Sequence, residues 1–333
     1  MSARTEIAAY PLLCRPILVP KPWGGRTLER VFGRALPAGQ AIGETWEVSP
    51  LSQAMSVVEN GPLAGSRLAD ALGGRQRSAP GREGEWAFPW LIKFLDARDN
   101  LSIQVHPKPR PPGQPQPADL KHEAWYVLYA DAGAQIFAGL RDGVSERDVA
   151  AANGSRALVG LLNAIPVAAG DCVYLPSGMI HALGAGILVA EVQTPSDTTY
   201  RMYDWDRVDG SGKPREMHLE QGLANTRFDV RAADLRPRPA RAAAGWSAAC
   251  EPLVRCDAFQ MDRIELRGTT EFVPISNRPE ALIVLTGGMR IQFAHGGAVE
   301  VAAGRTVVSP AGISPMRCSP LDDWAMALRV TVP

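Results

Sequence analysis

The sequence has 333 residues, of which 46% are hydrophobic and 21% are charged, and its 35 basic residues balance its 35 acidic ones. This length suits one large domain or two domains, each able to bury a core. A neutral chain without a basic stretch excludes nucleic acid or an anionic membrane as the main partner, and the lack of any apolar run of about 18 residues excludes a membrane-spanning helix.

The N-terminus and the cysteines favour a cytoplasmic location. Glu6 and Pro11 interrupt the apolar stretch that a signal peptide needs. The cysteines are odd in number, scattered and without a CxxC pair, which is typical of reduced thiols rather than of a disulfide framework. They are Cys14, Cys172, Cys250, Cys256 and Cys318.

Short apolar runs separated by Gly and Pro predict an all-β chain, with antiparallel strands that close into a barrel or a sandwich. In chain order, the strands are predicted at 124–129, 134–140, 171–176, 187–193, 281–287 and 306–312. A capping box at Ser145 predicts a helix to about Asn153, and further helices are predicted over 156–164 and from Glu216 onward. Two Pro-rich segments are predicted to be an extended loop (107–118) and a linker (229–245).

An internal repeat lies beneath these elements. Residues 170–181 follow the pattern G-x5-P-x-G-x2-H, and residues 304–315 repeat this frame with Pro315 in the place of His181. Upstream, Glu123 and Glu280 begin corresponding apolar runs. The segment between the glutamate and the G-x5-P-x-G-x2-H frame is longer in the first copy than in the second. This difference predicts a small helical insertion at about 141–165.

The repeated frame resembles the second sequence motif of cupin barrels. This resemblance implies an all-β fold of two cupin (jelly-roll) barrels in tandem with a small α-helical insertion. The expected domains are a catalytic one over 1–228, the linker 229–245 and a degenerate one over 246–333. In such a barrel, the histidine that follows the turn points into the barrel mouth.

A cupin metal site takes its other ligands from the first motif and from a later glutamate. Gln104 and His106 alternate on one predicted strand, so both face the same side, and Glu123 supplies a carboxylate. Together with His181 they form a set of nitrogen and oxygen ligands suited to one divalent ion per chain. Zinc is the leading choice, and other divalent ions are alternatives.

The whole chain also resembles the short form of the type I mannose-6-phosphate isomerases. The motifs that carry this resemblance are PKPWGG (20–25), GETWEVS (43–49), PWLIKFLDARDNLSIQVHP (89–107), KHEAWYVL (121–128), PSGMIHALGAGILVAEVQTPSDTTYRMYDWDR (176–207) and KPREMHLEQGL (213–223). The resemblance implies a cytoplasmic enzyme that interconverts mannose 6-phosphate and fructose 6-phosphate through a cis-enediol. The resemblance also places the family's zinc ligands on the four residues named above, which are Gln104, His106, Glu123 and His181.

The resemblance further implies the roles of other residues. Arg201 would stabilise the enediolate, Glu191 is one candidate for the base, and Lys93 and Lys121 would either bind phosphate or assist proton transfer. The expected catalytic residues are Arg201, Lys121 and Glu191, and the expected substrate-binding residues are Lys93, Ser102 and Trp23. Three further histidines are expected to be non-catalytic: His122, His218 and His295.

Three alternatives stay open at this level. They are a non-catalytic cupin that binds a sugar phosphate, an isomerase that acts on another phosphosugar, and an iron-dependent cupin oxygenase. The expected partner is a small-molecule sugar phosphate, with neither nucleic acid nor membrane, and the chain is expected to be a monomer or a weak homodimer. The Pro-rich loop replaces an acidic stretch of the family, so substrate entry is expected to differ.

Overall fold

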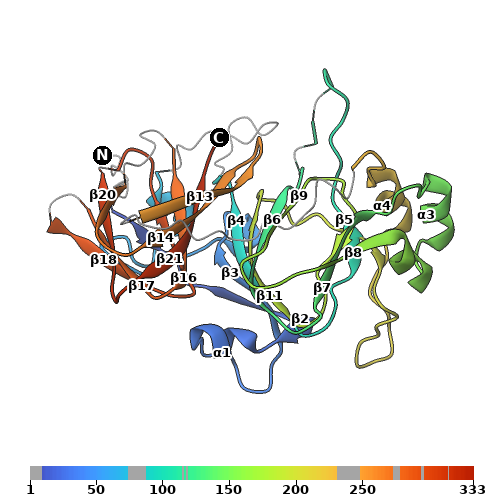
Figure 1. The fold of residues 1–333 in the computed structure, drawn as a ribbon, viewed down its shortest axis with the longest axis horizontal. Helices are drawn as coiled ribbons and strands as arrows, with labels where there is room; N and C mark the ends of the chain where they lie inside the picture. The colour runs from blue at the N-terminus through green and yellow to red at the C-terminus, as the bar shows by residue number, and fades with distance from the viewer. Residues whose placement is uncertain are drawn as a thin grey trace, which may run out of the picture.

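The computed structural model describes residues 10–73, 88–114, 116–117, 119–230, 248–272, 278–293, 296–313 and 315–333. Over these residues the chain is mostly β-sheet, in four sheets whose strands pair antiparallel (Figure 1). The predicted all-β class is therefore confirmed. Most of the predicted linker 229–245, and His295, fall outside the described residues.

The first half of the chain folds into two facing sheets. The six-stranded sheet has the order β2 (Ile17–Gly25), β3 (Ile42–Val48), β4 (Leu91–Ala97), β11 (Ile187–Gln193), β6 (Glu123–Ala130) and β9 (Cys172–Leu175). The five-stranded sheet has the order β12 (Tyr200–Tyr203), β5 (Ile103–Val105), β10 (His181–Ala182), β7 (Gln135–Leu140) and β8 (Leu162–Pro166).

The second half repeats this arrangement. Its six-stranded sheet has the order β1 (Leu12–Leu13), β19 (Arg305–Ser309), β16 (Glu280–Thr286), β21 (Ala325–Thr331), β14 (Gln260–Leu266) and β13 (Ala248–Arg255). Its four-stranded sheet has the order β15 (Thr270–Phe272), β20 (Met316–Pro320), β17 (Gly288–Gln292) and β18 (Ala298–Ala302). The edge strand β1 comes from the N-terminal end of the chain, so the first half contributes one strand to a sheet of the second.

The helices in the described ranges are short. They are α1 (Thr27–Phe32), α2 (Leu68–Ala71), α3 (Glu146–Ala152) and α4 (Leu219–Asn225), with 3-10 turns at η1 (Ser52–Ala54) and η2 (Arg156–Leu161). The capping box at Ser145 is present, and none of these helices has the length and apolarity to cross a membrane.

Two helix predictions need correction. The helix expected over 156–164 is a 3-10 turn that ends at Leu161, and the chain continues as β8 because Leu162–Pro166 pair with β7. The helix expected from Glu216 begins at Leu219. The residues before it are held by backbone bonds to β12 instead, among them one from His218 N–H to Arg201 O.

The strand β11 shows how the layers pack. Its sequence ILVAEVQ lacks simple alternation between apolar and polar residues because both of its faces are buried. Val189 contributes to the core between the two sheets of the first half, whereas Leu188 and Ala190 contribute to a separate core between the two halves. The strand β11 is therefore packed on both of its faces, by the facing sheet on one side and by the second half on the other.

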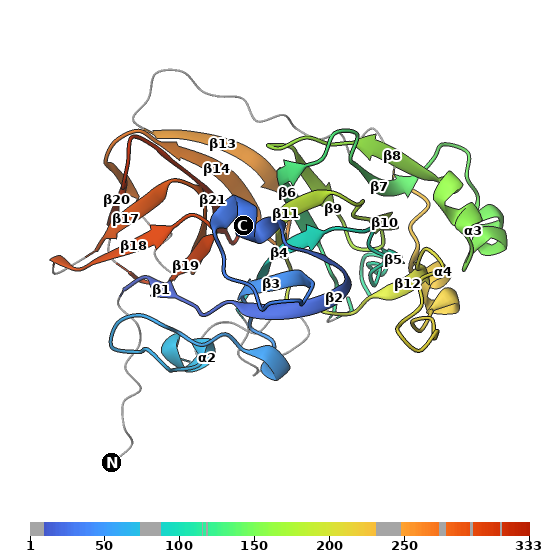
Figure 2. The same cartoon turned by 90° about the horizontal axis from the view of Figure 1, so that it is seen from below.

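The core between the halves joins the six-stranded sheets of both (Figure 2). It includes Phe94 of β4 and Ile283 of β16, both fully buried. Arg34 adds a polar link, because it donates hydrogen bonds to Glu47 in the first half and to Gly304 O in the second. The halves are thus joined by apolar packing as well as by β1.

The sequence repeat is also a structural repeat. In the first half β6 pairs with β9 and β11, and in the second half β16 pairs with β19 and β21 in the same way. The glycines of the frame, Gly170 and Gly178 in one copy and Gly304 and Gly312 in the other, all have φ between 77° and 96°. Glycine occupies these positions because other residues rarely adopt that conformation.

Candidate metal and active site

Strand register places three polar residues side by side on the five-stranded sheet. His181 of β10 pairs with Gln104 of β5, and Gln104 pairs on its other side with Arg201 of β12. Directly paired residues of antiparallel strands project from the same face of a sheet. Ile103 and Val105 on the opposite face pack in the cluster that contains α3 and α4 residues. The row of three therefore faces the six-stranded sheet.

The six-stranded sheet presents polar residues toward that row. Glu191 of β11 pairs with Lys93 of β4 on one side and with Trp125 of β6 on the other. Trp125 lies in the core between the two sheets, so its paired neighbours face inward as well. Glu123 begins β6 two residues earlier and shares this face. The site lies between the sheets at this end of β6.

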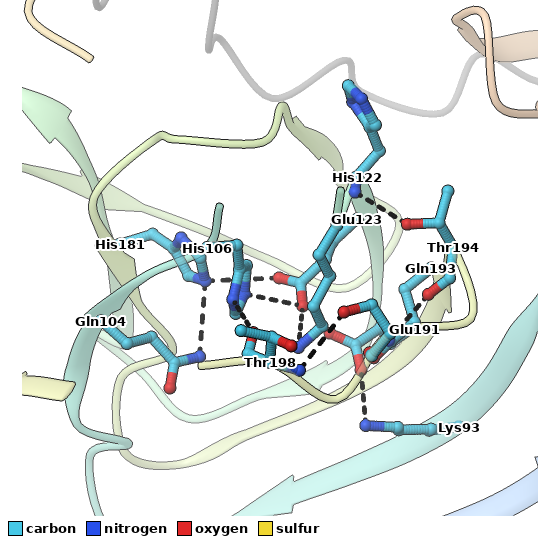
Figure 3. Close-up of polar contacts among 12 residues, drawn as sticks. Lys93, Gln104, His106, His122, Glu123, His181, Glu191, Gln193, Thr194 and Thr198 are labelled. Carbon is cyan, nitrogen blue, oxygen red and sulfur yellow. Dashed lines mark hydrogen bonds and ion pairs between the residues drawn. The ribbon is translucent and has the colours of Figure 1, made fainter. Parts of the chain in front are cut away.

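His106, Glu123 and His181 converge at the centre of the site (Figure 3). His106 Nε2 lies 3.1 Å from Glu123 Oε1, and His181 Nε2 lies 3.3 Å from Glu123 Oε2. All three residues are buried, and their ligand atoms lie within 4.8 Å of one another. The amide of Gln104 is 3.5 Å from His181 Nε2, and a half-turn of this amide presents its oxygen there.

Backbone carbonyls fix the orientation of both histidines. Nδ1 of His106 donates to Thr198 O at 2.9 Å, and Nδ1 of His181 donates to Met179 O at 2.8 Å. Each ring therefore turns its Nε2 lone pair toward Glu123. Burial, and then the positive charge of Lys121, lowers the pKa of His106 to about 3, which keeps this ring neutral near pH 7.

These residues fit a divalent metal ion. The neutral Nε2 of His106 and a carboxylate oxygen both carry lone pairs, so they repel each other unless a cation lies among them. Among the described residues, His106 Nε2 and Glu123 Oε2 are buried without a hydrogen-bond partner. Two imidazoles, a carboxylate and an amide oxygen, with the imidazoles oriented by carbonyls, form a donor set that zinc and similar ions accept.

Lys121 accompanies the carboxylate of Glu123. Its Nζ lies 2.9 Å from Glu123 Oε1, and both side chains are buried. Burial by itself would raise the pKa of Glu123, but Lys121 and His106 outweigh it and hold this pKa well below its usual range. Glu123 is therefore ionised, as a metal ligand must be.

The pKa of Glu191 is shifted in the opposite direction from that of Glu123. Burial, and then the negative charge of Glu123, raises its pKa to about 7, although Lys93 at 3.7 Å opposes the shift. The indole of Trp125 donates to Glu191 Oε1 at 2.8 Å and meets the ring of His181 edge-on. A carboxyl group of this pKa, held beside a metal site, can accept and return a proton near neutral pH.

Lys93 is held from its other side by residues that the sequence analysis did not assign. Glu44 Oε2 lies 3.4 Å from Lys93 Nζ, and the same carboxylate binds Lys21 at 3.0 Å and the indole of Trp46 at 2.7 Å. Burial would raise the pKa of Glu44, but Lys93 and Lys21 lower it to about 2. The GETWEVS motif contains both Glu44 and Trp46 and could have drawn attention to them.

The other predicted site residues lie around this centre. The guanidinium of Arg201 is half-buried and donates to Glu216 O at 2.7 Å. Ser102 is buried, and its hydroxyl lies 3.4 Å from Gln104 Oε1. Trp23 is 4% exposed and belongs to the core between the sheets.

His122 points away from the carboxylate of Glu123 (Figure 3). Its Nδ1 lies 2.7 Å from the hydroxyl of Tyr174. The described part of the Pro-rich loop follows His106 directly and is largely exposed.

In the second copy an arginine lies against Glu280, the glutamate that corresponds to Glu123. Glu280 pairs with Thr331 as Glu123 pairs with Gln193. Two residues before Thr331, at the position that Glu191 has in the first copy, stands Arg329, which donates to both oxygens of Glu280 at 2.8 Å. The charge that a metal would neutralise in this half is therefore neutralised by a side chain.

The fold and the site together define a metal-dependent protein of the cupin type. Residues 14–127 match the family described as phosphomannose isomerase type I, catalytic domain. Mannose-6-phosphate isomerase from Streptococcus mutans is 40% identical over 215 residues, which cover 65% of this chain and 67% of that protein. Mannose-6-phosphate isomerase ManA from Bacillus subtilis is 36% identical over 214 residues, which cover 64% of this chain and 67% of that protein. The chain belongs to the type I phosphomannose isomerases.

Solved structures extend the likeness to nearly the whole chain. The mannose 6-phosphate isomerase from Bacillus subtilis superimposes with a TM-score of 0.77 and 26% identity, over 96% of this chain and 99% of that one. A variant of phosphomannose isomerase from Salmonella typhimurium superimposes with a TM-score of 0.73, over 98% of this chain and 100% of that one. Its sequence identity is 18%, so this likeness supports the fold alone.

Proposed function

We propose that this protein is a metal-dependent aldose–ketose isomerase that interconverts D-mannose 6-phosphate and D-fructose 6-phosphate through a cis-enediol. One observation carries the proposal: the buried His106–Glu123–His181 cluster lies beside Glu191, a carboxyl group whose pKa is raised toward neutrality. The names of the relatives, mannose-6-phosphate isomerase, support mannose 6-phosphate as the substrate.

We assign the metal to Gln104, His106, Glu123 and His181, and zinc suits this set of nitrogen and oxygen ligands best. When bound, the ion would polarise the oxygens at C1 and C2 of the sugar as a Lewis acid. The protein's own contribution is to hold the ligands in place through Thr198 O and Met179 O.

Glu191 is the residue that we assign to proton transfer between C1 and C2. Its Oε1 accepts from Trp125 and its Oε2 faces Lys93, so the carboxyl group is fixed in orientation. Removing a proton from one carbon and returning it to the other requires one group that serves as both base and acid. A pKa of about 7 allows both roles near neutral pH.

Arg201 and Lys121 are the cations that we assign to the developing enediolate. Arg201 stands beside Gln104 in strand register and keeps its charge at any working pH. Lys121 lies against Glu123 within hydrogen-bond distance.

Three residues are assigned to substrate binding. Lys93 brings a positive charge between the sheets, and the Ser102 hydroxyl lies beside Gln104. Trp23 is packed in the core between the sheets. The Pro-rich loop starts at the metal ligand His106, so it is placed to affect which sugar phosphates enter.

We propose that the reaction takes place in the cytoplasm. The five cysteines are free thiols, which suits a reducing compartment. We propose a monomer or a weak homodimer.

The decisive experiment is a coupled assay of fructose 6-phosphate formation from mannose 6-phosphate, before and after treatment with a chelator, and again with zinc added back. Activity that is lost to the chelator and restored by the metal is expected. Binding of mannose 6-phosphate without turnover by metal-loaded protein would favour a sensor, and turnover of a different phosphosugar would change the substrate. Oxygen consumption would expose an oxygenase.

Arg201→Ala separates the catalytic role from metal binding. We expect this variant to lose turnover while it keeps its metal content, because Arg201 is not among the converging ligand atoms. Loss of metal together with activity would overturn the assignment of Arg201 to catalysis.

A further inference from the structure

We propose that His218 is a positioning residue for Arg201, and that it acts by completing the hydrogen bonds of the Arg201 backbone. This inference rests on the proposed function, in which Arg201 stabilises the enediolate. His218 is the residue before α4 and lies outside the metal cluster.

Arg201 lies on an exposed sheet edge. Its strand β12 is the last of the five-stranded sheet and, among the described strands, pairs with β5 alone. The outward side of an edge strand carries backbone groups without a neighbouring strand. At Arg201 a single residue takes the place of that strand: His218 N–H donates to Arg201 O at 2.8 Å, and Arg201 N–H donates to His218 Nδ1 at 3.2 Å.

The same short segment holds the side chain. Arg201 Nη1 donates to Glu216 O at 2.7 Å, two residues before His218. The Nε of Arg201 is buried and has no hydrogen-bond partner in the part of the chain that the structure describes. Backbone and guanidinium are therefore both oriented by residues 216–218, so a shift of this segment would move the charge relative to Gln104 and the metal ligands.

The segment is itself anchored at both ends. On one side Arg215 donates to the buried carboxylate of Asp204, the residue that directly follows β12, at 2.7 Å. On the other side α4 packs closely on β12, where a Cβ at Gly222 would lie 2.6 Å from Met202 Cγ. Residues 215–222 thus form a strap across the edge strand, with His218 at its centre.

The contact makes a specific chemical demand. The group at the Nδ1 position must accept a hydrogen bond, because the backbone N–H of Arg201 donates to it. A neutral imidazole with its proton on Nε2 meets this demand. Asparagine can place its side-chain oxygen at the Nδ1 position, whereas the longer glutamine extends toward the position of Nε2.

This difference supplies a matched pair of variants. We expect His218→Gln to lower kcat about fivefold, the effect of losing one hydrogen bond at a critical position, with KM and zinc content within twofold of the wild type. His218→Asn is expected to restore most of the loss. In an Arg201→Lys background, His218→Gln should cause no further decrease, because its effect passes through the guanidinium.

The results divide clearly. Equal activity of the Asn and Gln variants, loss of zinc in the Gln variant, or an undiminished effect in the Arg201→Lys background would each overturn the positioning role. Circular dichroism and zinc content verify that each variant is folded. If Gln at this position fails to fold, His218→Leu takes its place against Asn. Absence of turnover in the zinc-loaded wild type would defeat the proposed function instead, before any variant is compared.

Discussion

At the scale of single residues, the site is a series of buried acidic and basic side chains. Glu44, Lys93 and Glu191 follow one another across the inner face of the six-stranded sheet, and Glu123 and Lys121 continue the series. Buried charges are tolerated when each has an opposite partner. A divalent cation would join this series at Glu123, where the rings of His106 and His181 face the carboxylate.

Glu123 and its neighbour His122 offer a matched test of the metal site. We expect Glu123→Gln to lower zinc affinity by more than about tenfold, since it removes the charged ligand. His122→Phe should leave zinc content unchanged, because that side chain faces Tyr174. Zinc titration with a competing chelator measures both, and equal losses in the two variants would contradict the assigned ligand set.

Glu44 predicts a pH dependence of stability. Its pKa falls from 4.5 to about 2 in the folded protein, so its contribution is fully present above pH 4.5 and is lost as the pH drops toward 2. At pH 7 we expect Glu44→Gln to lower the free energy of unfolding by about 3 kcal/mol. Urea denaturation at several pH values should show this difference shrinking below pH 4.5. A constant difference would refute the linkage, and the exposed Glu146→Gln serves as the control.

At the scale of elements, the turn between β9 and β10 decides where His181 lies. This turn contains Gly178, whose φ is +83°, and a Cβ there would lie 2.7 Å from Lys108 Cβ and 2.8 Å from Arg227 Cγ. Glycine is therefore required both by the backbone conformation and by the close approach of two side chains.

We expect Gly178→Ala to lower the free energy of unfolding by about 2 kcal/mol and to weaken zinc binding through the displacement of His181. The control is Gly133→Ala, at φ +79° but with nothing within 4 Å of the added Cβ. It should show only the smaller cost of the backbone conformation and normal zinc content. A control as unstable as Gly178→Ala would show that the steric contact contributes nothing.

The sequence predicted strands better than helices, for a physical reason. Apolar runs such as ILVAEVQ are buried in the folded protein, and the strand predicted for this run is present as β11. The segment 156–164 has a helix-like apolar pattern, yet Leu162–Pro166 joins the open edge of β7 and ends the helix at Leu161. Pairing with a strand distant in the sequence overrode local propensity.

At the scale of the whole molecule, the two halves share a core and a buried ion pair. Arg34 binds Glu47, whose side chain is 1% exposed, and reaches across to Gly304 O. Removing one partner of a buried pair leaves an uncompensated charge. The contact therefore couples the stability of one half to that of the other.

We expect Arg34→Met to lower the free energy of unfolding by about 3 kcal/mol, and the double variant with Glu47→Gln to recover part of this loss. Arg98→Met, which removes an exposed pair with Asp99, should cost at most about 1 kcal/mol. Urea denaturation followed by tryptophan fluorescence and by circular dichroism gives both values. Separate transitions for the two probes would contradict the coupling of the halves.

The sequence by itself determined the all-β class, the repeat and the identity of the metal-ligand candidates, because these depend on local patterns: the G-x5-P-x-G-x2-H frame, the alternation of Gln104 and His106, and the runs that begin at Glu123 and Glu280. Only the tertiary structure decided which residues surround them. Strand register brought Arg201 beside Gln104 and His218 onto the edge of β12, packing enclosed Glu44 with Lys93, and Arg329 lies against Glu280 in the second half. Such contacts join residues that are distant along the chain, and sheet pairing and layer packing alone fix them.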